Sequence, residues 1–190
     1  MADSTTVLII RHADKPPDSG SGVNSSGLPD KESLTPLGWQ RAGVWAELFR
    51  PSFGSESLLP TPKVIFASAA GVASKSKRPL ETVVPLALKL GIPVDDVDQR
   101  FSKGGERELA QAVTNLSGVV LIAWQHEKIV DFTDALAPNT PGVPSGWPAS
   151  RFNVIFRFDR AAGSTDWSFT QIAPLMLGGD VAAPITLDGL

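Results

Sequence analysis

Apolar residues along this chain form two kinds of pattern, which alternate. Short runs rich in Val and Ile are typical of buried strands, whereas apolar residues recurring every three or four positions indicate helices. We expect strands at residues 5–10, 63–67, 118–123, 151–159 and 166–173. We expect helices from Pro36 to about Pro51, from about Pro79 to Gly91, over 106–116, and, following His126, through Ile129, Phe132 and Leu136.

This order of elements predicts an α/β protein, a three-layer α/β/α sandwich with a mainly parallel central sheet. The two late strands are expected to add to one side of the sheet as an antiparallel pair, with a small separate hairpin as the alternative. Pro85 falls inside the second helical pattern and is expected to kink or locally break that helix. The length of 190 residues suggests one domain, residues 1–190.

Composition narrows the function classes. Seventeen Lys and Arg against twenty Asp and Glu give a formal charge of −3, which argues against a nucleic-acid partner bound by a broad basic surface. The chain has no cysteine, so disulfides, thiolate catalysis and cysteine metal sites are excluded. No apolar run approaches the roughly 20 residues that span a bilayer, and the N-terminus lacks a signal-peptide pattern. We therefore expect a cytoplasmic protein without a membrane partner.

Two segments, 14–33 and 137–150, are rich in Ser, Gly or Pro and show no periodicity. Twenty residues without a pattern inside a small domain indicate either a functional loop or local disorder.

Chemistry-bearing residues follow three of the expected strands. Arg11 and His12 follow the first strand, residues 68–78 follow the second, and His126 and Glu127 follow the third. The carboxyl ends of parallel strands are where open α/β sheets bind ligands. Arg78 at the start of a helix opposes the helix dipole unless an anion binds at the same end.

Together these residues describe a pocket for a tetrahedral oxyanion. Two arginines offer planar donor groups suited to phosphate, and two histidines can serve as a nucleophile and as a further donor. Carboxylates at Asp14, Glu106 and Glu127 lie nearby in the sequence and can deliver a proton. The set predicts phosphoryl transfer through a covalent histidine.

Four segments, in order, resemble the histidine phosphatase superfamily with its phosphoglycerate mutase-like fold. Arg11-His12-Ala13 is similar to the family's Arg-His-Gly, and residues 34–42 (LTPLGWQRA) are similar to Leu-Thr-x-x-Gly-x-x-Gln-Ala. Residues 74–82 (SKSKRPLET) resemble Ser-x-x-x-Arg-x-x-Gln-Thr, and residues 120–126 (VLIAWQH) resemble the strand that delivers the second histidine. The resemblance covers roughly residues 5 to 130.

The resemblance implies a role for each residue. His12 is the nucleophile, and Arg11, Arg78 and His126 bind the phosphoryl oxygens. The implied function is a metal-independent phosphohydrolase, acting on a small phosphate ester through a phosphohistidine. It implies no cofactor and no metal, although a metal held by His12, His126 and a carboxylate is an alternative.

The chain also departs from the family pattern. Ala13 replaces a glycine, Glu81 replaces a glutamine, and Lys15 stands in the loop after the nucleophile, where it can add positive charge for a substrate anion. For the proton donor the first candidate is Glu127, which follows the second histidine directly. Glu106, in the region where the mutase branch keeps a glutamate, is the second candidate, and Asp14 is the third.

Two other functions fit the same residues. A phosphomutase or phosphotransferase would pass the phosphoryl group to a second acceptor instead of water. A catalytically silent relative would bind a phosphorylated ligand without turnover. In each case the expected partner is a small phosphorylated molecule, and no pattern in the sequence predicts an oligomeric state.

Overall fold

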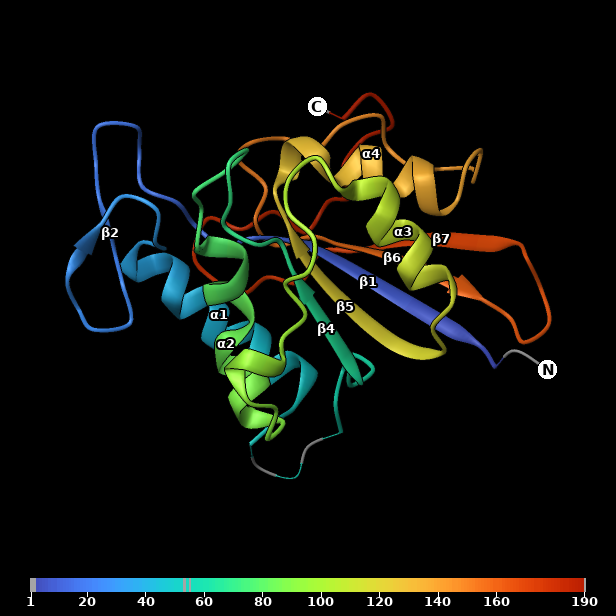
Figure 1. Ribbon diagram of the computed structural model, residues 1–190, viewed down its shortest axis with the longest axis horizontal. Coiled ribbons are helices and arrows are strands. Elements are labelled where there is room, and N and C mark those ends of the chain that lie inside the picture. The colour runs from blue at the N-terminus through green and yellow to red at the C-terminus, as the bar shows by residue number, and fades with distance from the viewer. Residues whose placement is uncertain (1–2, 53, 55, 190) are drawn as a thin grey trace.

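A five-stranded sheet forms the centre of the computed structural model, which describes residues 3–52, 54 and 56–189 (Figure 1). Its strands are β1 (Thr5–Arg11), β4 (Val64–Ala67), β5 (Gly118–Trp124), β6 (Ile155–Arg160) and β7 (Trp167–Ile172), in the order β4-β5-β1-β6-β7. Strands β4, β5 and β1 are parallel, whereas β6 pairs antiparallel with β1 and β7 antiparallel with β6. The carboxyl ends of the three parallel strands therefore meet at one end of the sheet.

Four helices cover the two faces of this sheet: α1 (Pro36–Phe49) and α2 (Arg78–Lys89) on one, α3 (Glu106–Thr114) and α4 (His126–Leu136) on the other (Figure 1). Strands β1 and β5 are buried on both faces because successive side chains point to opposite faces and helices cover each face. In β1, for example, Ile9 packs with α3 and α4 and Ile10 with α1 and α2. This is the expected three-layer arrangement.

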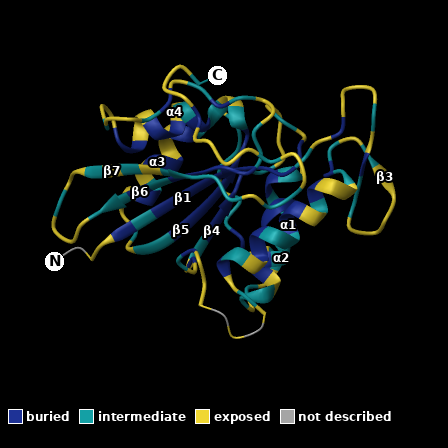
Figure 2. Ribbon diagram, turned by 180° about the vertical axis from the view of Figure 1, so that it is seen from behind, coloured by how far each residue is buried: buried dark blue, intermediate teal, exposed yellow. Residues whose placement is uncertain are grey.

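Figure 2 shows that burial is concentrated in the sheet and in the inner faces of these helices. None of the helices in the described part of the chain is long and apolar enough to cross a membrane.

The two late strands differ in part from their prediction. The predicted antiparallel addition to the main sheet is confirmed, because β6 pairs with β1 and β7 with β6; the alternative of a separate hairpin is wrong. However, β6 begins at Ile155, not at residue 151. The alternating pattern of residues 151–154 continues into the strand, but these residues pair with other parts of the chain. The side chain of Asn153, for instance, donates to the carbonyls of Pro174 and Val181, both 2.9 Å away.

The helix containing Pro85 is assigned without a break from Arg78 to Lys89. A local break at Pro85 is therefore wrong, whereas a kink there stays a prediction. Proline removes one backbone N–H from the helix, but buried Val83, Leu86 and Ala87 pack the surrounding turns against the sheet. Tertiary packing outweighs the local cost.

The patternless segment 14–33 contains a small hairpin, β2 (Gly22–Val23) paired with β3 (Pro29–Asp30), and extends away from the sheet (Figure 1). It is tied back by Val23, whose N–H donates to the carbonyl of Leu34 and whose carbonyl accepts from the Trp39 indole, both at 2.7 Å. These long-range bonds explain why no local pattern revealed the hairpin. The segment returns to the carboxyl end of β1 at residues 31–34.

Candidate active site

The end of β1 and the end of β5 lie side by side. Arg11 is paired with Trp124 in the parallel register, and the His12 backbone N–H donates to the Trp124 carbonyl at 3.0 Å. His126 begins α4 two residues after that strand ends. The two histidines predicted from the sequence are therefore brought to the same end of the sheet.

The ring of His12 is fixed in one protonation state. Its side chain is 4% exposed, and Nδ1 lies 2.8 Å from the carbonyl oxygen of Ala13. A carbonyl can only accept, so Nδ1 carries the proton and Nε2 keeps its lone pair. Burial, together with the positive charge of Arg11, lowers the pKa of His12 to about 3. His12 is a neutral imidazole at physiological pH, with Nε2 available as a nucleophile.

The side chain of Arg11 is fully buried and held on one side only. Nη1 donates to the carbonyl of Ala149 and lies 3.5 Å from the carbonyl oxygens of Pro148 and Arg151. The guanidinium carbon stacks 3.8 Å from the ring centroid of Phe152. Nε and Nη2 are buried and have no hydrogen-bond partner in the described part of the chain. Buried donors are almost always paired, so these two N–H groups point to an anionic ligand.

Burial lowers the pKa of Arg11 to about 10, which leaves it cationic at neutral pH. Unlike a lysine ammonium, it presents its charge in a fixed plane.

Arg78, the first residue of α2, is held by the returning end of the 14–33 segment. Its Nη2 donates to the Lys31 carbonyl at 2.6 Å, Nε to the Ser33 carbonyl at 3.3 Å, and Nη1 to Ser76 Oγ at 3.2 Å. The Arg78 charge also contributes to lowering the pKa of His12. Arg78 therefore belongs to the electrostatic surroundings of His12, and its predicted binding of phosphoryl oxygens stays a prediction.

Two side chains of α2 connect these pieces. The hydroxyl of Thr82 accepts from the Ala13 backbone N–H at 2.8 Å and donates to the Arg78 carbonyl at 2.7 Å. The carboxylate of Glu81, which replaces the family's glutamine, accepts from the Ser33 hydroxyl at 2.7 Å. These bonds fix the chain after His12 and the segment that holds Arg78 to one helix.

Asp14, the third candidate proton donor, is engaged in a structural contact. Its carboxylate lies 2.7 Å from the buried guanidinium of Arg41, which also binds Asp180 at 2.9 Å. Its carbonyl accepts from Thr35 at the start of α1. Gly38 lets that helix approach closely, because a Cβ there would lie 2.5 Å from the Asp14 carbonyl oxygen.

Glu127, the first candidate proton donor, forms an ion pair at the rim of the site. Its Oε2 lies 3.0 Å from Nδ1 of His126, although the pair lacks hydrogen-bond geometry, and its Oε1 accepts from Lys103 at 2.6 Å. The contact with His126 and the bond from Lys103 lower the pKa of Glu127 well below its usual range. An ionised carboxylate has no proton to give, so this arrangement favours positioning of His126. The proton-donor role of Glu127 stays a prediction.

Glu106, the second candidate, is 5% exposed at the first position of α3. Its Oε1 accepts from the Trp124 indole at 2.9 Å and from the Gly104 backbone N–H at 3.0 Å. These bonds tie the carboxylate to the last residue of β5, so Glu106 stays a candidate by position.

Lys15 lies on the surface, in a hollow of about 210 Å³. Lys31, Glu32 and Arg78 also line this hollow. Lys15 thus stands on the Arg78 side of the site. Its predicted contact with phosphate stays a prediction.

Three residues at this end of the sheet escaped prediction as site residues. Ser68 and Gln125 are 1% and 3% exposed, and their side-chain polar atoms have no hydrogen-bond partner in the described residues. Phe152 stacks on Arg11 from more than 140 positions away in the sequence. Only Gln125 carried a signal, its place directly before His126.

As for metals, no three His, Asp or Glu side chains gather closely enough to hold an ion in the part of the chain that the structure describes. The positive charges of Arg11 and Arg78 both act on His12, and such charges disfavour a cation there.

Comparison with solved structures identifies the fold. No family model matches the sequence, and no curated protein matches it. The protein histidine phosphatase SixA in complex with tungstate is similar in structure, with a TM-score of 0.57 and 17% identity over 88% of this chain and 96% of that chain.

Two further structures are similar over most of this chain. The mycobacterial glucosyl-3-phosphoglycerate phosphatase with VO3 has a TM-score of 0.52 and 15% identity over 87% of this chain and 96% of its own. The ecdysone phosphate phosphatase of Bombyx mori with tungstate has a TM-score of 0.52 and 14% identity over 94% and 97%. The chain shares the phosphoglycerate mutase-like fold of these structures, which confirms the predicted fold class.

Proposed function

We propose that this chain is a metal-independent phosphatase that releases phosphate from a small phosphate ester through a phosphohistidine on His12. The observation that carries the proposal is the neutral, buried ring of His12 beside Arg11, whose Nε and Nη2 are buried without a partner among the described residues. A nucleophile with a free lone pair next to unpaired cationic donors is the arrangement that phosphoryl transfer requires. The fold shared with three structures named as phosphatases supports it.

In the first step Nε2 of His12 attacks phosphorus. The P–N bond forms as the P–O bond to the leaving group breaks, and the electron pair departs with the leaving oxygen. Arg11 donates through Nε and Nη2 to the phosphoryl oxygens, and Arg78 and His126 add to their stabilisation. Since Arg11 and Arg78 are held by backbone carbonyls before substrate arrives, little reorganisation is needed in the transition state.

In the second step water attacks the phosphohistidine. The O–P bond forms, the P–N bond breaks, and the electron pair returns to Nε2. The imidazole leaves as the neutral ring, and both protons of the water stay with the product, dihydrogen phosphate. The low pKa of His12 assists this step because the free ring is stable in its neutral form.

The experiment compares wild type with His12→Ala on a panel of phosphate esters that includes p-nitrophenyl phosphate and small alkyl phosphates. We expect wild type to release inorganic phosphate from at least one ester, and the variant to release none above background. Treatment with EDTA should leave the wild-type rate unchanged. Activity that survives in His12→Ala, or that EDTA removes and a divalent metal restores, would contradict the proposal.

The same panel separates the two other functions. Transfer of phosphate to an added alcohol, without release to water, would assign a phosphotransferase. Binding of a phosphate ester without any turnover would assign a silent relative.

A further inference from the structure

Gln125 stands directly beside the nucleophile. The register of β1 and β5 pairs Arg11 with Trp124, and the His12 N–H continues that ladder by donating to the Trp124 carbonyl (Figure 1). Gln125 keeps extended backbone angles, φ −80° and ψ 130°. One step further along the two parallel strands therefore places Gln125 next to His12.

Both side chains project from the same face. Ile10 and Ala123, two residues before His12 and Gln125, both pack with α1 and α2. Because side chains in a strand alternate with a period of two, His12 and Gln125 share this face. The register thus places Gln125 beside His12, with both side chains on the same face of the sheet.

The chemistry of this amide sets it apart from the arginines. The Gln125 side chain is 3% exposed, and neither Nε2 nor Oε1 has a hydrogen-bond partner in the described part of the chain. Arg11 needs only acceptors, but an amide needs both an acceptor and a donor. A phosphoryl oxygen meets the first need, and an O–H group must meet the second.

We infer that Gln125 is a further catalytic residue, which positions the water that hydrolyses the phosphohistidine; the inference rests on the proposed function. Nε2–H donates to a phosphoryl oxygen on His12, and Oε1 accepts a hydrogen bond from the attacking water. The amide takes up no proton. It holds the water oxygen in line with the P–N bond while that bond breaks and both water protons leave with the phosphate.

The test separates formation of the phosphoenzyme from its hydrolysis. With p-nitrophenyl phosphate in a rapid-quench experiment, the burst of p-nitrophenolate reports phosphorylation of His12, and the later linear rate reports hydrolysis. We expect Gln125→Leu to keep its burst while the linear rate falls about a hundredfold, the scale for loss of one positioned donor. Acid-labile phosphate should then accumulate on the variant.

A second variant divides the two contacts. Gln125→Glu keeps an oxygen acceptor but loses the donor and adds a negative charge beside the phosphate. Its burst should slow, while hydrolysis of the phosphoenzyme that does form should be faster than in Gln125→Leu. The matched control is Gln111→Leu, a change of the same side chain at an exposed position of α3, which should behave as wild type.

The possible outcomes separate failure of the Gln125 role from failure of the proposed function. A Gln125→Leu protein whose burst and linear rates fall together, or in which neither changes, would overturn the role of Gln125 while leaving the phosphohistidine mechanism intact. If Gln125→Leu fails to fold, the Gln125→Glu protein carries the test, and equal losses in both of its rates would overturn the role. A wild-type protein that forms no phosphohistidine would overturn the proposed function itself, and this role with it.

Discussion

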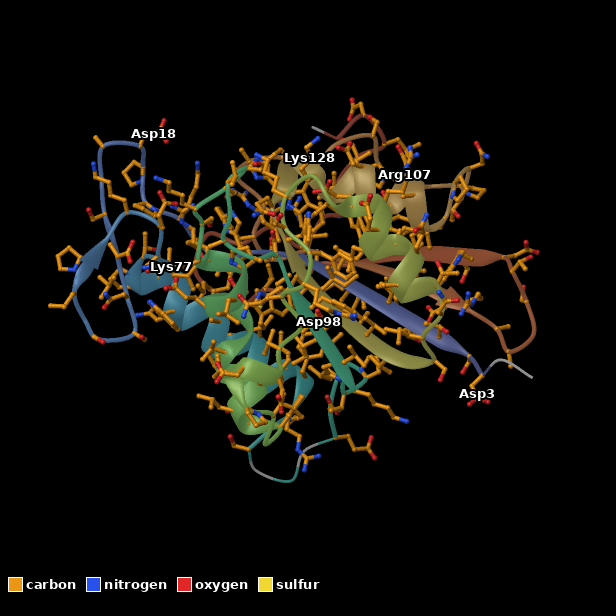
Figure 3. The ribbon with its side chains drawn as sticks, viewed as in Figure 1. Asp3, Asp18, Lys77, Asp98, Arg107 and Lys128 are labelled. Atoms are coloured by element: carbon orange, nitrogen blue, oxygen red, sulfur yellow. The ribbon has the colours of Figure 1, made fainter. Side chains whose placement is uncertain are left out.

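An arginine lies at each end of the central sheet, each against an aromatic ring. At the amino end of β1, Arg160 stacks 4.8 Å from the ring of Trp167, and its Nη2 donates to Thr5 Oγ1 at 3.0 Å and to the Thr114 carbonyl at 2.9 Å. At the carboxyl end, Arg11 stacks 3.8 Å from the ring of Phe152 but leaves Nε and Nη2 buried without a partner among the described residues. Figure 3 shows the two ends: Asp3 marks the amino end, while Lys77, before α2, and Lys128, in α4, mark the other.

The comparison of the two arginines shows that the volume of a hollow does not by itself indicate where a ligand binds. Arg160 lines a hollow of about 540 Å³, whereas the hollow beside Arg78 is about 210 Å³. Arg160 already binds protein oxygens, so its hollow presents no unmet need for a ligand. At the carboxyl end, unpaired donors and a free imidazole lone pair impose such a need. The unpaired donors at the carboxyl end are therefore what supports the proposed anion site there.

The largest effect is expected when Arg11 loses its planar pair of donors. Arg11→Lys keeps a positive charge but loses the planar pair of donors, and we expect kcat/KM for a phosphate ester to fall about a hundredfold or more. Arg160→Lys at the other end should change kcat/KM less than about twofold, since it is far from the reacting atoms. Steady-state kinetics on both variants provide the measurement. Equal losses would mean that the two arginines serve the fold in the same way.

The buried, neutral state of His12 can be tested through the pH dependence of the free energy of unfolding. The folded-state pKa of His12 is about 3, against an ordinary value of 6.5, so below pH 6.5 the unfolded chain binds a proton that the folded chain does not. Stability should therefore fall as pH drops from 6.5 towards 3. Between pH 6.5 and 4.5 this single group contributes a loss of about 2 kcal/mol.

Urea unfolding followed by tryptophan fluorescence measures that loss. His12→Gln cannot titrate, so its free energy of unfolding should fall less than that of wild type over the same interval. If both proteins lose the same amount, His12 is not buried as a neutral ring.

Most of the strands and helices, and the positions of both histidines, could be predicted from the sequence because they depend on local patterns. The apolar run ending at His12 and the one ending before His126 place both histidines after parallel strands, and the structure brings them together. The start of β6 and the β2–β3 hairpin could not be predicted, since each depends on bonds to distant residues.

The supporting parts of the site escaped prediction for the same reason. The carbonyls that hold Arg11 belong to residues 148–151, and the ring on which it stacks is Phe152. No spacing near Arg11 indicates either contact. The lowered pKa of Glu127 depends on its contacts with His126 and Lys103, and the contact with Lys103 becomes visible only once α3 and α4 are placed.

A smaller effect is expected from the two aromatic rings. Phe152→Leu removes the stacking on Arg11, a contact worth about 1 kcal/mol, so inhibition by vanadate should weaken about fivefold. Trp167→Leu removes the matching contact at the amino end and should leave vanadate inhibition unchanged. Phe152→Trp, which keeps a stacking surface, should restore most of the affinity. Weakening in both Leu variants would assign the rings a purely structural role.

The smallest effect is expected at Glu127. Because its carboxylate is ionised and partly exposed, Glu127→Gln should lower the rates on alkyl and aryl phosphates equally, by less than about fivefold. Alkyl leaving groups need a proton in the transition state, whereas p-nitrophenolate does not. A loss confined to alkyl phosphates would return the proton-donor role to Glu127. The same pair of substrates applied to Glu106→Gln tests the other candidate.

The proposed mechanism requires a covalent bond between phosphorus and Nε2 of His12. The most direct measurement is to quench the full-length protein during turnover of a radiolabelled phosphate ester and to locate the label by peptide mapping. We predict a phosphate that is labile in acid and stable in base, on the peptide containing His12, and absent from His12→Ala. Two results would contradict this mechanism. One is turnover with no trapped phosphate, even in Gln125→Leu under conditions that favour its accumulation. The other is label on another residue.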